Sequence, residues 1–225
     1  MTLDEILDGC PVDEIIGDNL VRAYSKINSN RYKNIVCTVS GGYDSDIVVD
    51  ICVKCDQHGK ISYVWFDTGL EYQATKDHLN DLEKKYGIKI QHEKAIKPIP
   101  SACREFGLPF VSKKVSENIE RLQRYNFEWK DEPFEELLKK YPKCRSALRW
   151  WCNEWGEGSQ FNISKNRYLK EYLIDNPPTR IKISPKCCKY AKKDVLHKTI
   201  KDKGFDLDIT GMRKAEGGSK DDKIR

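Results

Sequence analysis

The sequence has no apolar stretch long enough to cross a membrane. Charged residues make up 33% of its 225 residues, and the mean hydropathy is −0.69. A membrane helix needs about 20 consecutive apolar residues, and no run approaches that length. The first residues, Met1 to Asp8, are acidic and amphipathic, unlike a basic signal peptide. We therefore expect a cytoplasmic protein with no membrane partner.

Two common phosphate-binding motifs are also missing, since the chain contains neither Gly-x-x-x-x-Gly-Lys-Ser/Thr nor Gly-x-Gly-x-x-Gly. Its four histidines show no metal or triad spacing. The nine cysteines are an odd number and, in a reducing compartment, do not indicate a disulfide framework. No internal repeat or low-complexity tract occurs. These absences leave a single globular enzyme or binding domain as the expectation.

The charge balance is mildly basic. The net charge is +5, from 40 basic and 35 acidic residues. A general nucleic-acid binder usually concentrates more positive charge. Five lysines do cluster, at Lys182, Lys186, Lys189, Lys192 and Lys193. They fit either a solvated helix face or a contact with phosphate or nucleic acid.

Apolar runs alternate with helical patterns along much of the chain. We expect strands at residues 35–39, 61–66, 88–92 and 207–210, with helices at 46–57 and 71–86 between the first three. Such alternation predicts parallel pairing with right-handed crossovers, hence an α/β fold with an open, mostly parallel sheet flanked by helices. Ligands bind at the carboxyl ends of such strands. The loops that begin at Ser40 and Asp67 should face the same crevice.

The remaining segments are mainly helical. We expect helices at 4–28, 113–125, 134–140, 164–175 and 187–203, and a short strand at 180–183. Prolines interrupt the strand–helix rhythm after residue 97. The predicted organisation is an N-terminal helical segment at 1–30, a main domain at 31–218 and a loose polar tail at 219–225. A helical insertion at about 97–160 is expected to lie over the crevice.

Residues 40–45, Ser-Gly-Gly-Tyr-Asp-Ser, lie between the first strand and a helix. Both glycines can adopt backbone angles that turn amide N–H groups toward one anion. The start of the helix adds further donors and the positive end of its dipole. The serines supply hydroxyls, and Asp44 is suited to a divalent cation or a substrate proton. The segment predicts a nucleotide phosphate site, with a plain turn as the alternative.

Two further segments follow predicted strands. Phe66-Asp67-Thr68-Gly69 offers a carboxylate and a hydroxyl for ribose or adenine, or else forms an Asp-initiated turn. Gly211-Met212-Arg213 with Glu216 follows the last strand. Arg213 can bind phosphate through its planar guanidinium group, and Glu216 can orient Arg213 or bind a cation. The alternative is an exposed Arg–Glu pair at helical spacing.

Cysteines form a third group of candidate residues, at Cys144, Cys152, Cys187 and Cys188. Four thiolates can hold a [4Fe–4S] cluster. Zinc sites usually show cysteine pairs two to four residues apart, which is not the spacing here. Buried structural thiols are the alternative interpretation. Cys103 has no partner in any pattern.

Val39 to Ser45 resembles the PP-loop, Ser-Gly-Gly-x-Asp-Ser, of the adenine nucleotide alpha-hydrolase superfamily. Within it the chain is most similar to the phosphoadenosine phosphosulfate (PAPS) reductase family. The resemblance implies that Asp44 and Arg213 serve catalysis. It also implies nucleotide binding by Ser40, Gly41, Gly42, Tyr43, Asp44, Ser45, Phe66, Asp67, Thr68, Gly69, Gly211, Arg213 and Glu216.

The sequence departs from that family in two ways. Cys187-Cys188 is similar to the family's cluster motif, yet no cysteine follows Cys188. The nucleophilic Glu-Cys-Gly-Leu-His motif of the reductases is also missing, so thiosulfonate chemistry has no evident first step. We therefore expect cleavage of ATP, with Mg²⁺, between its alpha and beta phosphates. This would adenylate an acceptor and release pyrophosphate in the service of sulfur transfer.

The expected partners are an adenine nucleotide and either a nucleic acid or a sulfur-donor protein. Two alternatives remain open. One is reduction of PAPS or adenosine phosphosulfate (APS), which the missing thiol argues against. The other is a non-catalytic nucleotide-binding subunit.

Overall fold

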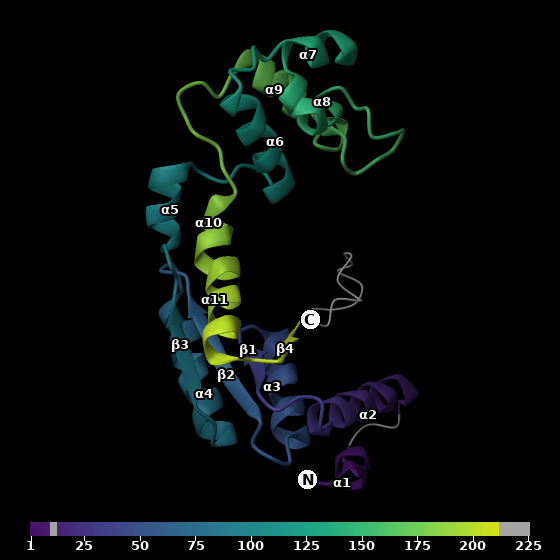
Figure 1. Cartoon of the computed structure of the whole chain (residues 1–225), viewed down its shortest axis with the longest axis vertical. Helices are drawn as coiled ribbons and strands as arrows, with labels where there is room; N and C mark the ends of the chain where they lie inside the picture. Colours follow the sequence, from purple (N-terminus) through teal and green to yellow (C-terminus); the bar gives the residue numbers. More distant parts are fainter. Residues whose placement is uncertain (10–12, 212–225) are drawn as a thin grey trace. The chain divides into compact units, whose positions relative to one another are not determined.

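The computed structural model describes residues 1–9 and 13–211, which form two compact units (Figure 1). The first unit consists of Met1–Ile96 and the described residues from Ala191 onward, and the second consists of Lys97–Tyr190. No helix within these described ranges has the length and apolar character needed to span a membrane. Arg213, Glu216 and the predicted tail at 219–225 lie outside the described residues.

The first unit is built on a four-stranded parallel sheet, which confirms the predicted fold class. Its strands are β1 (Ile35–Thr38), β2 (Ile61–Asp67), β3 (Ile90–Lys94) and β4 (Leu207–Thr210), in the order β3-β2-β1-β4. Ile35 in β1 aligns with Ile61 in β2 and with Leu207 in β4. Strands rich in β-branched residues suit a sheet that is buried on both faces.

The helices of the first unit are α1 (Leu3–Asp8), α2 (Glu14–Asn28), α3 (Tyr43–Cys55), α4 (Gln73–Tyr86) and α11 (Asp194–Lys203). α3 links β1 to β2, and α4 links β2 to β3, as crossovers of a parallel sheet must. Gly87 and Gly204 end α4 and α11 in the left-handed conformation. The core between sheet and crossover helices includes Val49, Trp65 and Leu79.

The second unit is helical. It contains α5 (Ile99–Phe106), α6 (Lys113–Arg124), α7 (Phe134–Lys140), α8 (Arg145–Trp151), α9 (Leu169–Asp175) and α10 (Lys186–Cys188), with short 3₁₀ turns at Pro142–Cys144 and Ile163–Lys165. Its core is aromatic. Phe127, Trp129 and Trp151 meet edge to face, with ring centres 5.4 to 5.7 Å apart. This arrangement suits the quadrupoles of the rings.

The predicted strand at 180–183 does not form. Its only ladder contact within the described chain is an isolated bridge between Leu108 and Ile183. Gln123 on α6 holds the segment instead, because its side chain donates to the carbonyls of Pro178 and Ile181 and accepts from the Ile183 N–H. A side chain thus replaces the partner strand that the alternating pattern had suggested.

Several predicted elements have different bounds. The segment expected to be helical at 4–28 contains two helices, α1 and α2, and the helices expected at 46–57 and 71–86 begin at Tyr43 and Gln73. The strand expected at 88–92 is β3 at Ile90–Lys94.

Two further differences have a clear cause. The helix expected at 164–175 begins only at Leu169, because Tyr168 has a φ of +64° and breaks the helical path. The helix expected at 187–203 is divided into α10, a π-helical turn at Lys189–Lys193, and α11. Such π turns are uncommon and often accompany functional sites.

Candidate functional site

The glycine loop (residues 40–45) connects β1 to α3 at the carboxyl edge of the sheet. Gly41 has a φ of +74°, and a Cβ atom there would lie 2.8 Å from Cγ2 of Thr75 on α4. Only glycine therefore fits this position without a movement of Thr75. The turn brings the chain close to α4 before α3 begins.

The serines of the loop fix its shape. The Ser45 hydroxyl donates to the Gly42 carbonyl at 3.0 Å and accepts the Ser40 N–H at 3.3 Å. The Ser40 hydroxyl accepts the Gly42 N–H at 3.4 Å. Because Ser45 is also buried, it supports the loop from inside. The loop is thus held in its conformation by its own side chains.

A cavity of about 360 Å³ opens over the loop. It is lined by Thr38, Ser40, Gly42, Tyr43, Asp44, Ser45 and Gly211. The parallel register explains why Gly211 is there, because Thr210 at the end of β4 lies beside Thr38 at the end of β1. A Cβ atom on Gly211 would lie 3.3 Å from the Asp44 backbone. The structure therefore brings together two segments that the sequence had predicted to share one site.

The cavity has the donors that an anion requires. Gly42 caps α3 and has no side chain of its own to accept hydrogen bonds from the N–H groups of the first turn. The amide groups and dipole of the helix start attract phosphate. Asp44 and the hydroxyls of Thr38 and Ser40 are oxygen ligands of the kind that Mg²⁺ prefers. The residues present therefore fit a phosphate together with a magnesium ion.

A second cavity of about 200 Å³ adjoins the first, and Ser40 lines both. Its other walls are Val39, Trp65, Phe66, Glu71, Lys192, Lys193 and Leu196. Phe66 was predicted as a binding residue, whereas the two lysines were noted only as part of a basic cluster. They come from the π-helical turn. Thr38 and Glu71 were not singled out from the sequence, because neither belongs to a recognisable motif.

Asp67, Thr68 and Gly69 line neither of these two cavities. Asp67 accepts the Gly69 N–H at 2.9 Å, so the Asp-initiated turn considered for this segment does form. The Thr68 side chain is buried, and its hydroxyl donates to Glu71 at 2.7 Å. The segment thus positions Glu71 in the wall of the second cavity.

The four cysteines proposed for a cluster are not gathered into one ligand set. Across residues 1–9 and 13–211, no group of three or more His, Cys, Asp or Glu side chains can hold a metal ion. The thiols of Cys144 and Cys152 point to the carbonyls of Arg121 and Glu132, each at 3.8 Å. Burial raises the pKa of the Cys152 thiol to about 11. These two residues behave as structural thiols.

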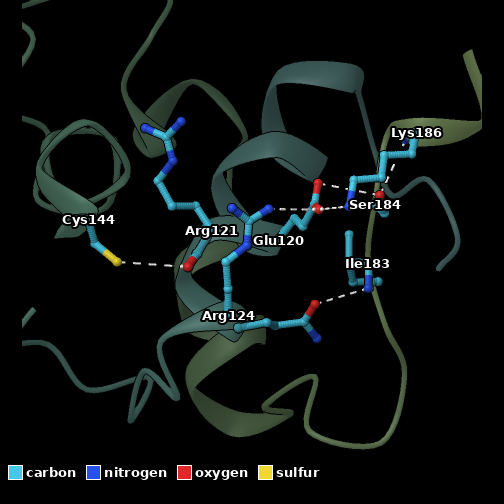
Figure 2. Close-up of polar contacts among 8 residues, drawn as sticks. Glu120, Arg121, Arg124, Cys144, Ile183, Ser184 and Lys186 are labelled. Carbon is cyan, nitrogen blue, oxygen red and sulfur yellow. Dashed lines mark hydrogen bonds and ion pairs between the residues drawn. The ribbon is translucent and has the colours of Figure 1, made fainter. Parts of the chain in front are cut away.

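Figure 2 shows the reason for this separation. Cys144 lies on one side of α6, while Ser184 and Lys186 lie on the other, where Glu120 binds both. Lys186 immediately precedes Cys187 in α10. Since a [4Fe–4S] cluster needs its thiolates around one centre, the observed arrangement does not fit it.

A parallel sheet with a glycine loop between its first strand and helix defines a nucleotide-binding α/β protein. The phosphoadenosine phosphosulfate reductase domain matches residues 34–149, about half the chain, and the protein belongs to that family. Members of this family use nucleotides and are generally enzymes. The match begins just before β1 and covers the glycine loop and the Asp67–Gly69 turn.

A curated relative is less informative about activity. An uncharacterised protein of Methanocaldococcus jannaschii is 26% identical over 151 residues, which cover 67% of this chain and 29% of that protein. The chain thus spans less than a third of that relative's length.

Proposed function

We propose that the first unit binds ATP and cleaves it between the alpha and beta phosphates. The observation that carries the proposal is the cavity over the glycine loop, where helix-start donors, hydroxyls and the Asp44 carboxylate line one space of about 360 Å³. Hydrogen-bond donors can bind a phosphate, and a carboxylate beside them can bind the metal ion that accompanies it. The pyrophosphate portion of the nucleotide belongs in this cavity.

The nucleoside belongs in the adjoining cavity. Phe66 and Trp65 offer apolar and aromatic surface there, and Glu71 offers acceptors for ribose or adenine donors. Ser40 stands at the junction of the two cavities. Together the two volumes fall within the range of small-ligand sites, which is about 300 to 1,000 Å³.

The chemistry follows from where the charges lie. Lys192 and Lys193 enter the wall of the second cavity next to Ser40, so the bound phosphates are approached by positive charge from that side as well. Cleavage of an inner phosphate bond builds negative charge on the departing pyrophosphate, which such groups stabilise. Bound Mg²⁺ would neutralise phosphate charge, held by Asp44 and nearby hydroxyls. Arg213, outside the described residues, is the proposed further cation.

The acceptor of the adenylate is proposed to be an anionic molecule, with nucleic acid the preferred class and sulfur transfer the preferred purpose. Residues 97–190 carry 19 Lys and Arg against 12 Asp and Glu, so the basic excess of the chain resides in the second unit. Aromatic side chains are exposed there next to cations, as at Tyr168 beside Arg167. Basic residues interleaved with aromatic ones suit single-stranded nucleic acid.

The test is to incubate the purified protein with ATP and Mg²⁺, with and without RNA or DNA, and to measure pyrophosphate and AMP. We expect equal release of the two products and loss of release in Asp44→Asn. Asp202→Asn is the matched control, because Asp202 is an exposed carboxylate on α11. Nucleic acid should raise the rate if it is the acceptor.

Three results would contradict the proposed cleavage of ATP. Sulfite release from PAPS with no pyrophosphate from ATP would identify a reductase. Nucleotide binding with no turnover under any condition would indicate a non-catalytic subunit. Absence of nucleotide binding, measured by equilibrium dialysis, would remove the site itself.

A further inference from the structure

The thiol groups of Cys103 and Cys187 meet within the second unit. Cys103 is on α5 and Cys187 is on α10, and their side chains form a hydrogen bond. The two helices pack directly against each other. Cys103 had no partner in the sequence, and Cys187 was expected to face the other cluster cysteines. The fold pairs them with each other instead.

An aromatic contact holds the two helices in this arrangement. Phe106 follows Cys103 by three residues and Tyr190 follows Cys187 by three residues, so each ring lies about one helical turn from its thiol. The rings stack with centres 4.8 Å apart and planes at 17°. At the end of α5, Gly107 approaches the Lys182 carbonyl so closely that a Cβ atom would lie 2.4 Å away. The thiols are therefore held in place from both sides.

The surroundings of the pair favour the neutral thiol at Cys103, because burial raises its pKa. The ammonium groups of Lys97 and Lys186 lie 4.8 and 5.3 Å from the centre of the Phe106 ring, and each is paired with a carboxylate. A thiol of the pair must therefore lose its proton before it attacks a disulfide. Cys103 is partly exposed, which gives a small reagent access to the pair.

A second thiol pair shows why access matters. Cys37 on β1 and Cys52 on α3 are also hydrogen-bonded to each other. Their side chains are 0% and 1% exposed, inside the core of the first unit. That pair has no route to a reagent in solution. It is an internal comparison for the pair of Cys103 and Cys187, because the two thiols are in contact in both pairs but only Cys103 is partly exposed.

We propose that Cys103 and Cys187 form a reversible dithiol–disulfide site that exchanges with small disulfides and dithiols. One cysteine, as thiolate, attacks a sulfur of the small disulfide and expels one thiolate. The other cysteine loses its proton, attacks the mixed disulfide and expels the second thiolate. Two electrons pass from the cysteines to the reagent, whose two sulfurs leave as thiols. The site is independent of the ATP reaction proposed for the first unit.

The test uses the whole chain, fully reduced and then equilibrated with mixtures of reduced and oxidised glutathione before alkylation. We expect the folded protein to lose two of its nine thiols and to regain them with dithiothreitol. Trypsin releases Cys187 together with Cys188, so the peptide is analysed in Cys188→Ser. In that variant a linked peptide joining residues 95–104 to 187–189 identifies the bond without ambiguity.

Matched variants decide between the outcomes. Cys187→Ser should leave Cys103, the accessible thiol, as a stable mixed disulfide with glutathione, and Cys152→Ser should still form the bond. Circular dichroism of each variant separates loss of the bond from loss of the fold. Separate glutathione adducts on Cys103 and Cys187 in the folded wild type, with no linkage, would overturn the proposal. So would stoichiometric iron that is lost in Cys187→Ser.

Discussion

His78 on α4 and Asp46 in the first turn of α3 are joined by a hydrogen bond of 2.7 Å between Nε2 and Oδ2. The bond connects the two crossover helices that flank the glycine loop. Asp46 immediately follows the loop, and His78 is one helical turn beyond Thr75, whose Cγ2 would lie 2.8 Å from a Cβ atom on Gly41. The other carboxylate oxygen of Asp46 is buried with no hydrogen-bond partner among the described residues. Asp46 thus depends on a single side-chain contact.

Removal of the His78 ring should loosen the loop. We expect His78→Ala to lower the free energy of unfolding by about 1 kcal/mol, the usual value of such a bond, and to weaken ATP binding several-fold. His78→Gln, which keeps a donor, should recover part of both losses. His58→Ala changes an exposed histidine and is the control. Denaturant unfolding and equilibrium dialysis provide the two measurements, and unchanged ATP affinity in His78→Ala would refute the link.

Gly41 allows a comparison that isolates steric contact from backbone strain. Gly41 and Gly59 both have positive φ, at +74° and +63°, but only a Cβ on Gly41 would meet another atom. Both alanine variants should lose about 1 kcal/mol from the left-handed backbone. Gly41→Ala should lose more and should bind ATP at least tenfold more weakly, because the loop must move away from Thr75.

A second change in the same variant tests that cause. Thr75→Ser removes the Cγ2 methyl group that lies 2.8 Å from the added Cβ. ATP affinity measured by dialysis should therefore return toward the wild-type value in Gly41→Ala with Thr75→Ser. No recovery would mean that the backbone angle alone, and not the contact with α4, determines the loss.

The sheet and the loop were predictable because their signals are local. Strands buried on both faces read as short apolar runs, and β4 has the bounds that the sequence predicted. The glycine loop is recognised because strand, glycines and helix start are contiguous in the chain. The proximity of the loop to Gly211 was expected because the carboxyl ends of parallel strands lie at the same edge of the sheet. These steps need no knowledge of distant contacts.

The errors occurred where distant side chains decide the structure. Polar and apolar residues alternate over 180–183 as in a strand, but the Gln123 side chain forms hydrogen bonds with the Ile181 carbonyl and the Ile183 N–H. Four cysteines were grouped because a [4Fe–4S] cluster needs four thiolates. Which cysteines are in contact depends instead on which helices face one another. Cys103 and Cys187 are 84 positions apart in sequence and share no motif. Only the packing of α5 on α10 brings them together.

Thr68 should matter through Glu71. In Thr68→Val the side chain keeps its shape but loses the hydroxyl that donates to Glu71 at 2.7 Å. A hydrogen bond to a charged group contributes about 1.5 to 3 kcal/mol, and Glu71 would lose its fixed position in the second cavity. We expect a higher KM for ATP with little change in kcat. Thr199→Val removes a buried hydroxyl on α11 and is the control; an equal rise in KM there would contradict the role of Glu71.

Because of Cys152, we expect the free energy of unfolding to fall as the pH rises above 9. Burial raises the pKa of its thiol from 9.0 to about 11, so the folded state favours the neutral thiol more than the unfolded state does. The stabilisation is complete below pH 9 and is lost as the pH rises toward 11, because the unfolded chain gives up its proton first. Since Cys152 is only partly buried, we expect about 1 kcal/mol from this residue.

Other groups also titrate in this range, so the measurement is a difference. The free energy of unfolding of Cys152→Ala is subtracted from that of the wild type, and this difference is followed from pH 8 to 11. The difference should shrink as the pH rises, while Cys188→Ala, whose cysteine is also partly exposed, provides the comparison. A difference that is constant across the range would show that the Cys152 thiol titrates alike in the folded and unfolded chains.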